Sequence, residues 1–209
     1  MLKIARTYLT DPKTTERIAQ WCEEEDILYA RRFKKNHRKQ QSLTARYLIR
    51  FVFQKYWQTR SQDLKISTGE NGEILLHLQT AEIHLWASIS HSQNLVCIAL
   101  SDDGPIGIDT EFCDPDRDIL KLVSNFYPDF SGGLLCAYKF WTLNEAYGKA
   151  SGQGLDFSKA KLCYQIARGA LTDPRFNTAF ENDYVIATFT PDGKWVEGFT
   201  DEFQQKTDS

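Results

Sequence analysis

The order of hydrophobic patterns along this 209-residue chain predicts an α+β fold made of two similar halves. Helix-spaced apolar residues are followed by strand-like runs, and the same order then occurs again further along the chain. The length suffices for one large domain or for two small halves that share a core. The expected division is 1–104, 105–200 and a disordered polar tail at 201–209. No sequence repeat accompanies this division, so it depends on the order of elements alone.

Two helices followed by strands are expected in the first half. Residues 14–33 form the first expected helix, with Thr14 or Thr15 as its cap. Residues 41–57 form the second, because Leu43, Tyr47 and further apolar residues recur at helical spacing. Three strand-like runs follow, at residues 74–78, 82–88 and 94–100, and a fourth, at residues 105–111, begins the second half.

The second half is expected to repeat this order. The patterns predict helices at residues 116–126 and 133–150. Strand-like runs follow at residues 160–166 and 184–190. Together with the first half, these elements give the predicted α+β class.

The overall composition is that of an ordinary globular protein, with 42% hydrophobic and 25% charged residues. A net charge of −3 gives no reason to expect nucleic-acid binding. Five scattered cysteines without a C-x-x-C pair indicate reduced thiols. The sequence contains neither a signal peptide nor an apolar run long enough to span a membrane. We therefore expect a cytoplasmic protein, and a monomer, because one chain holds both halves.

The segment RRFKKNHRK at residues 31–39 carries six Lys or Arg residues and no acid. It directly follows an acidic run at residues 23–26. Two interpretations stay open for it: a solvated helix end, or a local site for phosphate groups.

Acidic residues in PIGIDTEF are the clearest candidates for metal binding. Strand alternation places Asp109 and Glu111 on one face, about 6–7 Å apart. Such a pair is often only an exposed polar face, but a third converging acid would suit Mg²⁺. Glu145, in FWTLNEAYGKASGQGL, is the best candidate for that acid. Glu145 and Lys149 stand one helical turn apart, which by itself also fits a surface ion pair.

The segment WASISHSQN offers candidates for phosphate binding. Ser88, Ser90, His91 and Ser92 are expected at a strand end and in the loop after it. Hydroxyl groups, backbone N–H groups and a histidine in such a loop can hold a phosphate, although an incidental histidine is the simpler interpretation. A serine hydrolase is disfavoured, because the chain has no G-x-S-x-G turn.

Taken in order, SISHS, GIDTE and FWTLNEAYGKASGQGL resemble three sequence blocks of the 4′-phosphopantetheinyl transferases of the surfactin-synthetase-activating type. The resemblance covers about 70 residues, from Trp86 to Leu155. It implies two α+β halves with pseudo-two-fold symmetry and a coenzyme A site between them. The implied reaction moves phosphopantetheine from coenzyme A to a serine of an acyl or peptidyl carrier protein and releases 3′,5′-ADP.

The same resemblance implies roles for individual residues. Asp109, Glu111 and Glu145 would hold Mg²⁺, and Lys149 would lie beside the transferred group. His91, with Ser90, would contact a coenzyme A phosphate. The basic residues implied at the 3′-phosphate are Arg31, Arg38, Lys39 and Arg46. The general base is either Glu145 or a water on the metal.

Three positions depart from the family pattern. Asn144 stands where the family usually has a lysine, and Glu73 replaces a phosphate-binding lysine. Asp129 is the only acid near a position where the family often has glutamate. Two alternatives therefore stay open: a non-catalytic family member that binds coenzyme A or carrier proteins, and an unrelated Mg²⁺-dependent phosphodiesterase. The carrier could belong to fatty-acid, polyketide or nonribosomal peptide biosynthesis.

Overall fold

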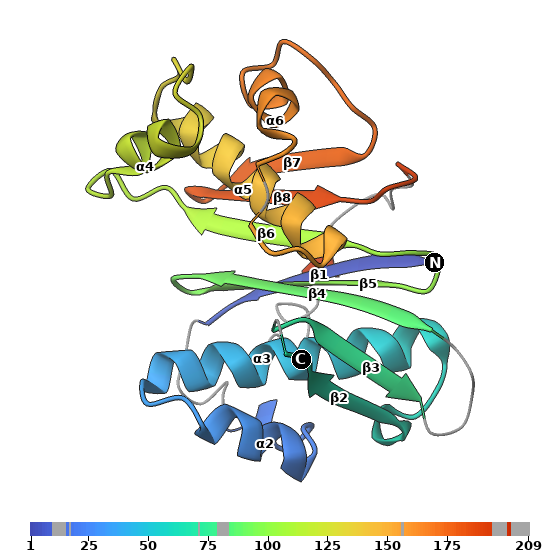
Figure 1. The fold of residues 1–209 in the computed structure, drawn as a ribbon. Helices are drawn as coiled ribbons and strands as arrows, with labels where there is room; N and C mark the ends of the chain where they lie inside the picture. The colour runs from blue at the N-terminus through green and yellow to red at the C-terminus, as the bar shows by residue number, and fades with distance from the viewer. Residues whose placement is uncertain are drawn as a thin grey trace. The chain divides into compact units, whose positions relative to one another are not determined.

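The computed structural model describes residues 1–9, 16, 18–70, 72–78, 84–155, 157–193 and 200–201 (Figure 1). The chain divides into two compact units: unit 1 is Met1–Asp103 with Val196–Ser209, and unit 2 is Gly104–Trp195. Each unit combines helices with a β-sheet, so the predicted α+β class is confirmed. The predicted symmetry between the halves stays a prediction, and residues 202–209 of the expected tail lie outside the described residues.

Unit 1 contains a six-stranded sheet in the order β2-β3-β4-β5-β1-β9. Its strands are β1 (Leu2–Tyr8), β2 (Leu64–Thr68), β3 (Ile74–Leu78), β4 (Leu85–Ser92), β5 (Leu95–Ser101) and β9 (Thr200–Asp201). All neighbours are antiparallel except β1 and β9, which are parallel. Sequence patterns predicted β3, β4 and β5 but missed β1 and β2. Residue 200, expected in the second half, belongs to unit 1 because β9 pairs with β1.

The predicted helix at residues 14–33 is wrong in its continuity. The chain turns where the Trp21 amide donates to the Ile18 carbonyl (3.0 Å), and α2 (Glu24–Arg31) begins only afterwards. Three acidic residues occupy the first turn of α2, where negative charge favours the positive end of the helix dipole. The acidic run at residues 23–26 therefore starts a helix. The proposed caps at Thr14 and Thr15 lie outside the described residues.

The second predicted helix of unit 1 is confirmed as α3 (Asn36–Trp57), which begins five residues earlier than expected. A 3₁₀ helix, η1 (Ser61–Asp63), follows before β2. Leu48, Ile49, Val52 and Phe53 of α3 are fully buried. They form one core with apolar residues of the sheet, including Val96, Ile98 and Leu100 of β5. The helix therefore covers one face of this sheet.

A buried charge cluster joins α2 to α3. Asp26, only 1% exposed, accepts from Arg46 Nη1 at 3.1 Å and from Arg50 Nε at 2.5 Å. Arg46 also stacks over the Tyr29 ring at 3.8 Å, and Arg50 donates to the carbonyls of η1 and β2. Paired and hydrogen-bonded in this way, the three charges tolerate burial.

Unit 2 contains a three-stranded antiparallel sheet in the order β6-β8-β7. Its strands are β6 (Gly107–Phe112), β7 (Phe176–Glu181) and β8 (Tyr184–Phe189). Its helices are α4 (Ile119–Phe126), α5 (Leu134–Ser151) and α6 (Ala160–Ala167). The predicted strand at 160–166 is wrong, because Ala160, Cys163, Tyr164 and Ala167 are buried at helical spacing in α6.

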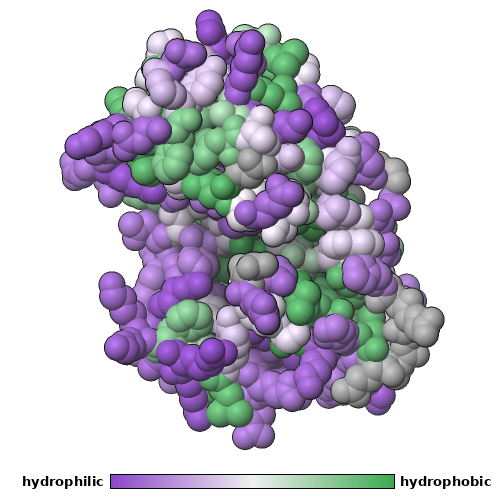
Figure 2. All heavy atoms as spheres, in the orientation of Figure 1, coloured by the Kyte–Doolittle hydropathy of each residue, from purple (hydrophilic) through white to green (hydrophobic). Residues whose placement is uncertain are grey.

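The surface of unit 2 exposes apolar side chains over α4 (Figure 2). Leu120 and Phe126 of this helix are 41% and 42% exposed. The Phe126 ring stacks on Phe157 with their centroids 4.4 Å apart, and so is only partly solvated. In the described part of the chain, no helix combines the length and the apolar character that crossing a membrane requires.

Candidate acidic site and phosphate-contact residues

Gly107 allows β6 to lie directly against the backbone of α5. A Cβ atom at this position would stand 1.8 Å from the Ala146 carbonyl oxygen and 2.9 Å from the Ala150 nitrogen. Only a residue without a side chain fits such a contact. Glu145 is the neighbour of Ala146, so this contact brings the acids of β6 close to the acid of α5.

Asp109 of β6 forms an ion pair with Lys149 of α5. Lys149 Nζ donates to Asp109 Oδ1 at 2.8 Å and to the Ile108 carbonyl at 3.1 Å. Asp109 is 6% exposed, whereas the Lys149 side chain is 30% exposed, so the pair lies where the buried region meets the solvent. The lysine predicted beside the transferred group is thus held against a predicted metal ligand.

Glu111, two residues further along β6, contacts a basic residue that the sequence patterns did not indicate. Arg117 Nη1 lies 3.0 Å from Glu111 Oε2. Arg117 comes from the segment between β6 and α4. The sequence shows that residue 117 is basic. Its pairing with Glu111 depends on the path of the segment between β6 and α4, which the sequence does not show.

Glu145 is half-buried on α5 and lies within electrostatic reach of both acids of β6. Burial raises the pKa of its carboxyl above the ordinary value, and the charges of Asp109 and Glu111 raise it further. Lys149 acts in the opposite direction and lowers the pKa. The predicted acids therefore act on one another electrostatically, although they come from two different elements.

The donor set suits a hard divalent cation such as Mg²⁺, since it consists of carboxylate oxygens whose charges repel one another. Within the described residues, no three or more His, Cys, Asp or Glu side chains are arranged as a metal-binding group. Asp109 and Glu111 contact Lys149 and Arg117 instead. The residues thus fit the cation in chemical type and charge, and a cation would compete with two basic side chains for them.

Asn144 is fully buried, at 0% exposure, and its amide donates to the Phe140 carbonyl at 2.7 Å. The side chain is thus part of the interior of unit 2. Its packing explains why an uncharged residue is accommodated here, because a lysine would have to bring its charge out of that interior. Of the other departures, Glu73 is exposed in the turn before β3.

Ser90 and His91 lie within β4 and not in a loop, so their side chains point to opposite faces of the sheet. His91 is paired with Val96 of β5, which belongs to the core that α3 covers. His91 therefore stands on the same face as α3. Ser90, 6% exposed, stands on the other face, so the two side chains point away from each other.

The predicted basic residues fall into two groups. Arg31 ends α2 and is exposed, whereas Arg38 and Lys39 lie in the first two turns of α3. The Arg38 guanidinium lies over the Phe33 ring at 4.7 Å, and burial lowers its pKa. Arg46 differs from these exposed or half-buried residues, because it is 3% exposed and its guanidinium donates to Asp26. The structure therefore corrects the expectation that Arg46 contacts a phosphate.

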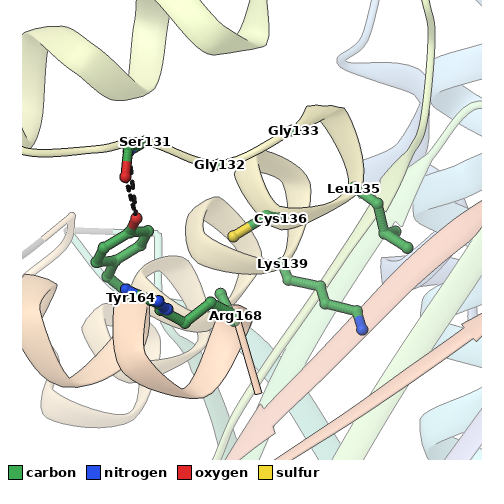
Figure 3. Close-up of a pocket in the computed structure, with 9 residues that line it drawn as sticks. Ser131, Gly132, Gly133, Leu135, Cys136, Lys139, Tyr164 and Arg168 are labelled. Carbon is green, nitrogen blue, oxygen red and sulfur yellow. Dashed lines mark hydrogen bonds between the residues drawn. The ribbon is translucent and has the colours of Figure 1, made fainter. Parts of the chain in front are cut away.

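A cavity of about 460 Å³ opens in unit 2 (Figure 3). It is lined by the segment before α5, by Cys136 and Lys139 of α5, and by Tyr164 and Arg168. The Ser131 hydroxyl and the Tyr164 hydroxyl lie 2.9 Å apart at its edge. None of the predicted site residues lines this cavity.

The chain is similar in sequence to two curated proteins. It is 27% identical over 148 residues to the 4′-phosphopantetheinyl transferase HetI of Nostoc sp. (strain PCC 7120), a match that covers 66% of this chain. It is 28% identical over 141 residues, or 63% of this chain, to a Synechocystis sp. protein whose assignment as a 4′-phosphopantetheinyl transferase is itself provisional. The chain spans 62% and 57% of the lengths of these relatives.

No protein-family model matches the chain. Among solved structures, Helicobacter pylori holo-[acyl-carrier-protein] synthase in complex with coenzyme A aligns with 48% of this chain and 97% of its own, at 16% identity and a TM-score of 0.38. A TM-score below 0.5 does not establish that the two chains share a fold. The similarity that the sequence supports is therefore to 4′-phosphopantetheinyl transferases, and it extends over about two thirds of the chain.

Proposed function

We propose that this protein is a Mg²⁺-dependent 4′-phosphopantetheinyl transferase. It transfers the phosphopantetheine group of coenzyme A to a serine hydroxyl of an acyl or peptidyl carrier protein and releases 3′,5′-ADP. The observation that carries the proposal is the electrostatic coupling of Glu145 to Asp109 and Glu111, with Lys149 bound to Asp109. Sequence similarity to transferases of this activity supports it independently.

Asp109, Glu111 and Glu145 would hold the cation. When bound, Mg²⁺ would neutralise the negative charge that grows on the pyrophosphate as its anhydride bond breaks. The two β6 acids stand on a strand fixed against α5 at Gly107, so the donors are held by backbone packing. Rigid positioning of charged groups supplies much of the catalysis in phosphoryl transfer.

Lys149 and Glu145 serve the transferred group in this proposal. Lys149 carries a positive charge that stabilises phosphoryl oxygens or the departing 3′,5′-ADP. Glu145 has its pKa raised by burial and by the neighbouring acids, which makes it a better proton acceptor for the attacking serine hydroxyl. We therefore favour Glu145 as the general base.

In unit 1, we propose that His91, Arg38 and Lys39 contact the phosphates of coenzyme A. His91 stands on the face of the sheet that α3 covers, and both basic residues lie in the first two turns of α3. Exposed Arg31, at the end of α2, can add positive charge. Ser90 can contribute only from the opposite face or through its backbone. The proposal further includes a monomer in the cytoplasm.

One assay tests the proposed function. The protein is incubated with coenzyme A, Mg²⁺ and apo carrier proteins of the fatty-acid, polyketide and nonribosomal types, and mass spectrometry detects any added phosphopantetheine. We expect transfer to at least one carrier, abolished by Asp109→Asn and by chelation of Mg²⁺. Asp116→Asn is the matched control, because this exposed aspartate lies outside the acidic site.

Other results would select a different function. Coenzyme A binding without transfer to any carrier would identify a non-catalytic binding protein. Mg²⁺-dependent cleavage of phosphodiesters without carrier modification would identify a phosphodiesterase. Full transfer activity in the folded Asp109→Asn variant would contradict the metal assignment.

A further inference from the structure

The turn between β4 and β5 has a conformation that needs outside support. Ser92 pairs with Leu95, so Gln93 and Asn94 alone form the turn. Gln93 has φ 45°, in the left-handed region. That conformation costs a residue with a side chain about 1–2 kcal/mol, because Cβ crowds the backbone.

Two side chains of α3 hold the backbone carbonyl of Gln93. His37 Nε2 lies 2.7 Å from this oxygen, and Gln41 Nε2 donates to it at 2.8 Å. The two residues are four positions apart and therefore share one face of the helix. A carbonyl oxygen only accepts, so the His37 ring carries its proton on Nε2 in this contact. His37 Nε2 and Gln41 Nε2 lie 3.2 Å apart, because both donate to the same carbonyl oxygen of Gln93.

Burial makes the Gln41 contact costly to lose. Gln41 is 5% exposed, so its amide would be left largely unsatisfied without the Gln93 carbonyl. The other carbonyl of the turn is also held, since the Leu9 amide donates to the Asn94 oxygen at 2.7 Å. The end of the hairpin is thus attached to α3 on one side and to the chain after β1 on the other.

These contacts fix the hairpin end against the start of α3. His91 stands two residues before Gln93 on β4, on the face of the sheet that α3 covers. Arg38 and Lys39 lie in the same helical turns as His37 and Gln41. Any movement of the turn away from α3 would therefore separate His91 from these two basic residues.

We propose that His37 and Gln41 are positioning residues, which hold His91 in register with Arg38 and Lys39 for binding the phosphates of coenzyme A. This inference rests on the proposed function for the identity of the ligand. Neither residue needs to touch coenzyme A, because both act through the Gln93 carbonyl.

Gln41→Glu tests the proposal, because it keeps the shape of the side chain and replaces the donor with an acceptor that repels the Gln93 carbonyl. We expect the Kd for coenzyme A, measured by titration calorimetry, and the KM for coenzyme A to rise about tenfold, the equivalent of one charge-opposed hydrogen bond. We expect kcat to change by less than about twofold, because the acidic site is unaltered. Gln40→Glu, the same change one position earlier, is the matched control.

His37 provides the second variant. His37→Gln keeps a donor and is expected to bind coenzyme A as the wild type does, whereas His37→Ala removes one of the two donors and weakens binding. His37 is exposed, so both variants are expected to fold even where Gln41→Glu does not, as thermal unfolding will show. Unchanged Kd, KM and kcat in folded Gln41→Glu and His37→Ala would overturn the proposal. Equal loss in Gln40→Glu would also overturn it.

A readout without coenzyme A separates this inference from the proposed function. The chain has four histidines, so the ring signals of His91 can be assigned by NMR. We expect them to shift in Gln41→Glu and not in Gln40→Glu. If the wild type does not bind coenzyme A, the proposed function fails, and unmoved His91 signals in Gln41→Glu would then overturn the positioning role.

Discussion

Two arginines of α3 that stand close together in the sequence have different environments in this protein. Arg38 lies over an aromatic ring at the start of α3, while Arg46, two turns later, is sealed against Asp26. The family resemblance implied phosphate contacts for both, because a sequence shows the residue type and not its burial.

Strand alternation and motif spacing predicted that the three acids and Lys149 are neighbours. Lys149 donates to Asp109, and the charges of Asp109 and Glu111 raise the pKa of Glu145, while the roles of these residues stay a prediction. The pairing of Arg117 with Glu111 was missed, because it depends on the path of a loop.

Replacing Asp26 tests the buried charge cluster. In Asp26→Asn, two arginines that are each 3% exposed lose their counter-charge, and we expect a loss of about 3 kcal/mol of unfolding free energy. Urea unfolding measures it. Glu25→Gln, at the exposed neighbouring position, removes the same charge and should change stability by less than about 0.5 kcal/mol. Equal losses in the two variants would show that the ion pairs are not the cause.

Arg117 is expected to weaken cation binding at the acidic site, because it occupies Glu111. Arg117→Ala should therefore tighten Mg²⁺ binding by up to about fivefold, the range expected for a partly exposed ion pair. The measurement is the rise of the thermal unfolding temperature with Mg²⁺ concentration, which needs no activity assay. Arg168→Ala, which changes an arginine of unit 2 that lines the cavity and not the acidic site, should leave this dependence unaltered. Weaker Mg²⁺ binding in Arg117→Ala would contradict the competition.

At the scale of elements, the sequence predicted the long helices with a clear buried face. It failed for short elements, whose conformation depends on the elements packed against them. The apolar spacing identified α5 to within one residue at each end and α3 except for its first five residues. The segment Ala160–Ala167 was mistaken for a strand because eight residues give a weak periodicity, and its four buried positions become evident only against α5. Strand β1 was missed because the buried Arg6 interrupts its apolar pattern.

The contact of β6 with α5 predicts a severe effect of a single methyl group. In Gly107→Ala, the new Cβ would meet three backbone atoms of α5 that cannot move separately, and we expect a loss of about 3 kcal/mol of unfolding free energy. Transfer activity should fall as well, because Asp109 and Glu145 depend on this approach. Gly133→Ala is the control, since a Cβ there has no atom within 4 Å and φ is −80°. Chemical denaturation of both variants provides the comparison, and equal stability would refute the close contact.

At the scale of the whole molecule, each unit has its own apolar core and a cysteine in contact with that core whose thiol pKa is raised. Burial raises the pKa of Cys22 in unit 1 to about 12, with the charge of Asp26 adding to the effect. Burial likewise raises the pKa of Cys163 in unit 2 to about 12. The ordinary value is 9.0, so the folded protein keeps these protons at a pH where the unfolded chain releases them.

Stability is therefore expected to fall as the pH rises from about 9 towards 12. A raised folded pKa contributes stability that is complete below the unfolded pKa and is lost as the pH approaches the folded value. Urea midpoints at pH 8 and pH 10 measure this loss. The double variant Cys22→Ala and Cys163→Ala should lose less between the two pH values than the wild type. An identical loss would assign the alkaline sensitivity to other groups.

The parallel pairing of β9 with β1 has a consequence for synthesis of the chain. Unit 2 is an insertion between β5 and β9, so the sheet of unit 1 is completed only by residues that leave the ribosome after unit 2. Until then, β1 presents an open backbone edge, on which a foreign strand could add. Co-translational folding of unit 1 must therefore proceed with its outermost strand missing while the 92 residues of unit 2 are still being made.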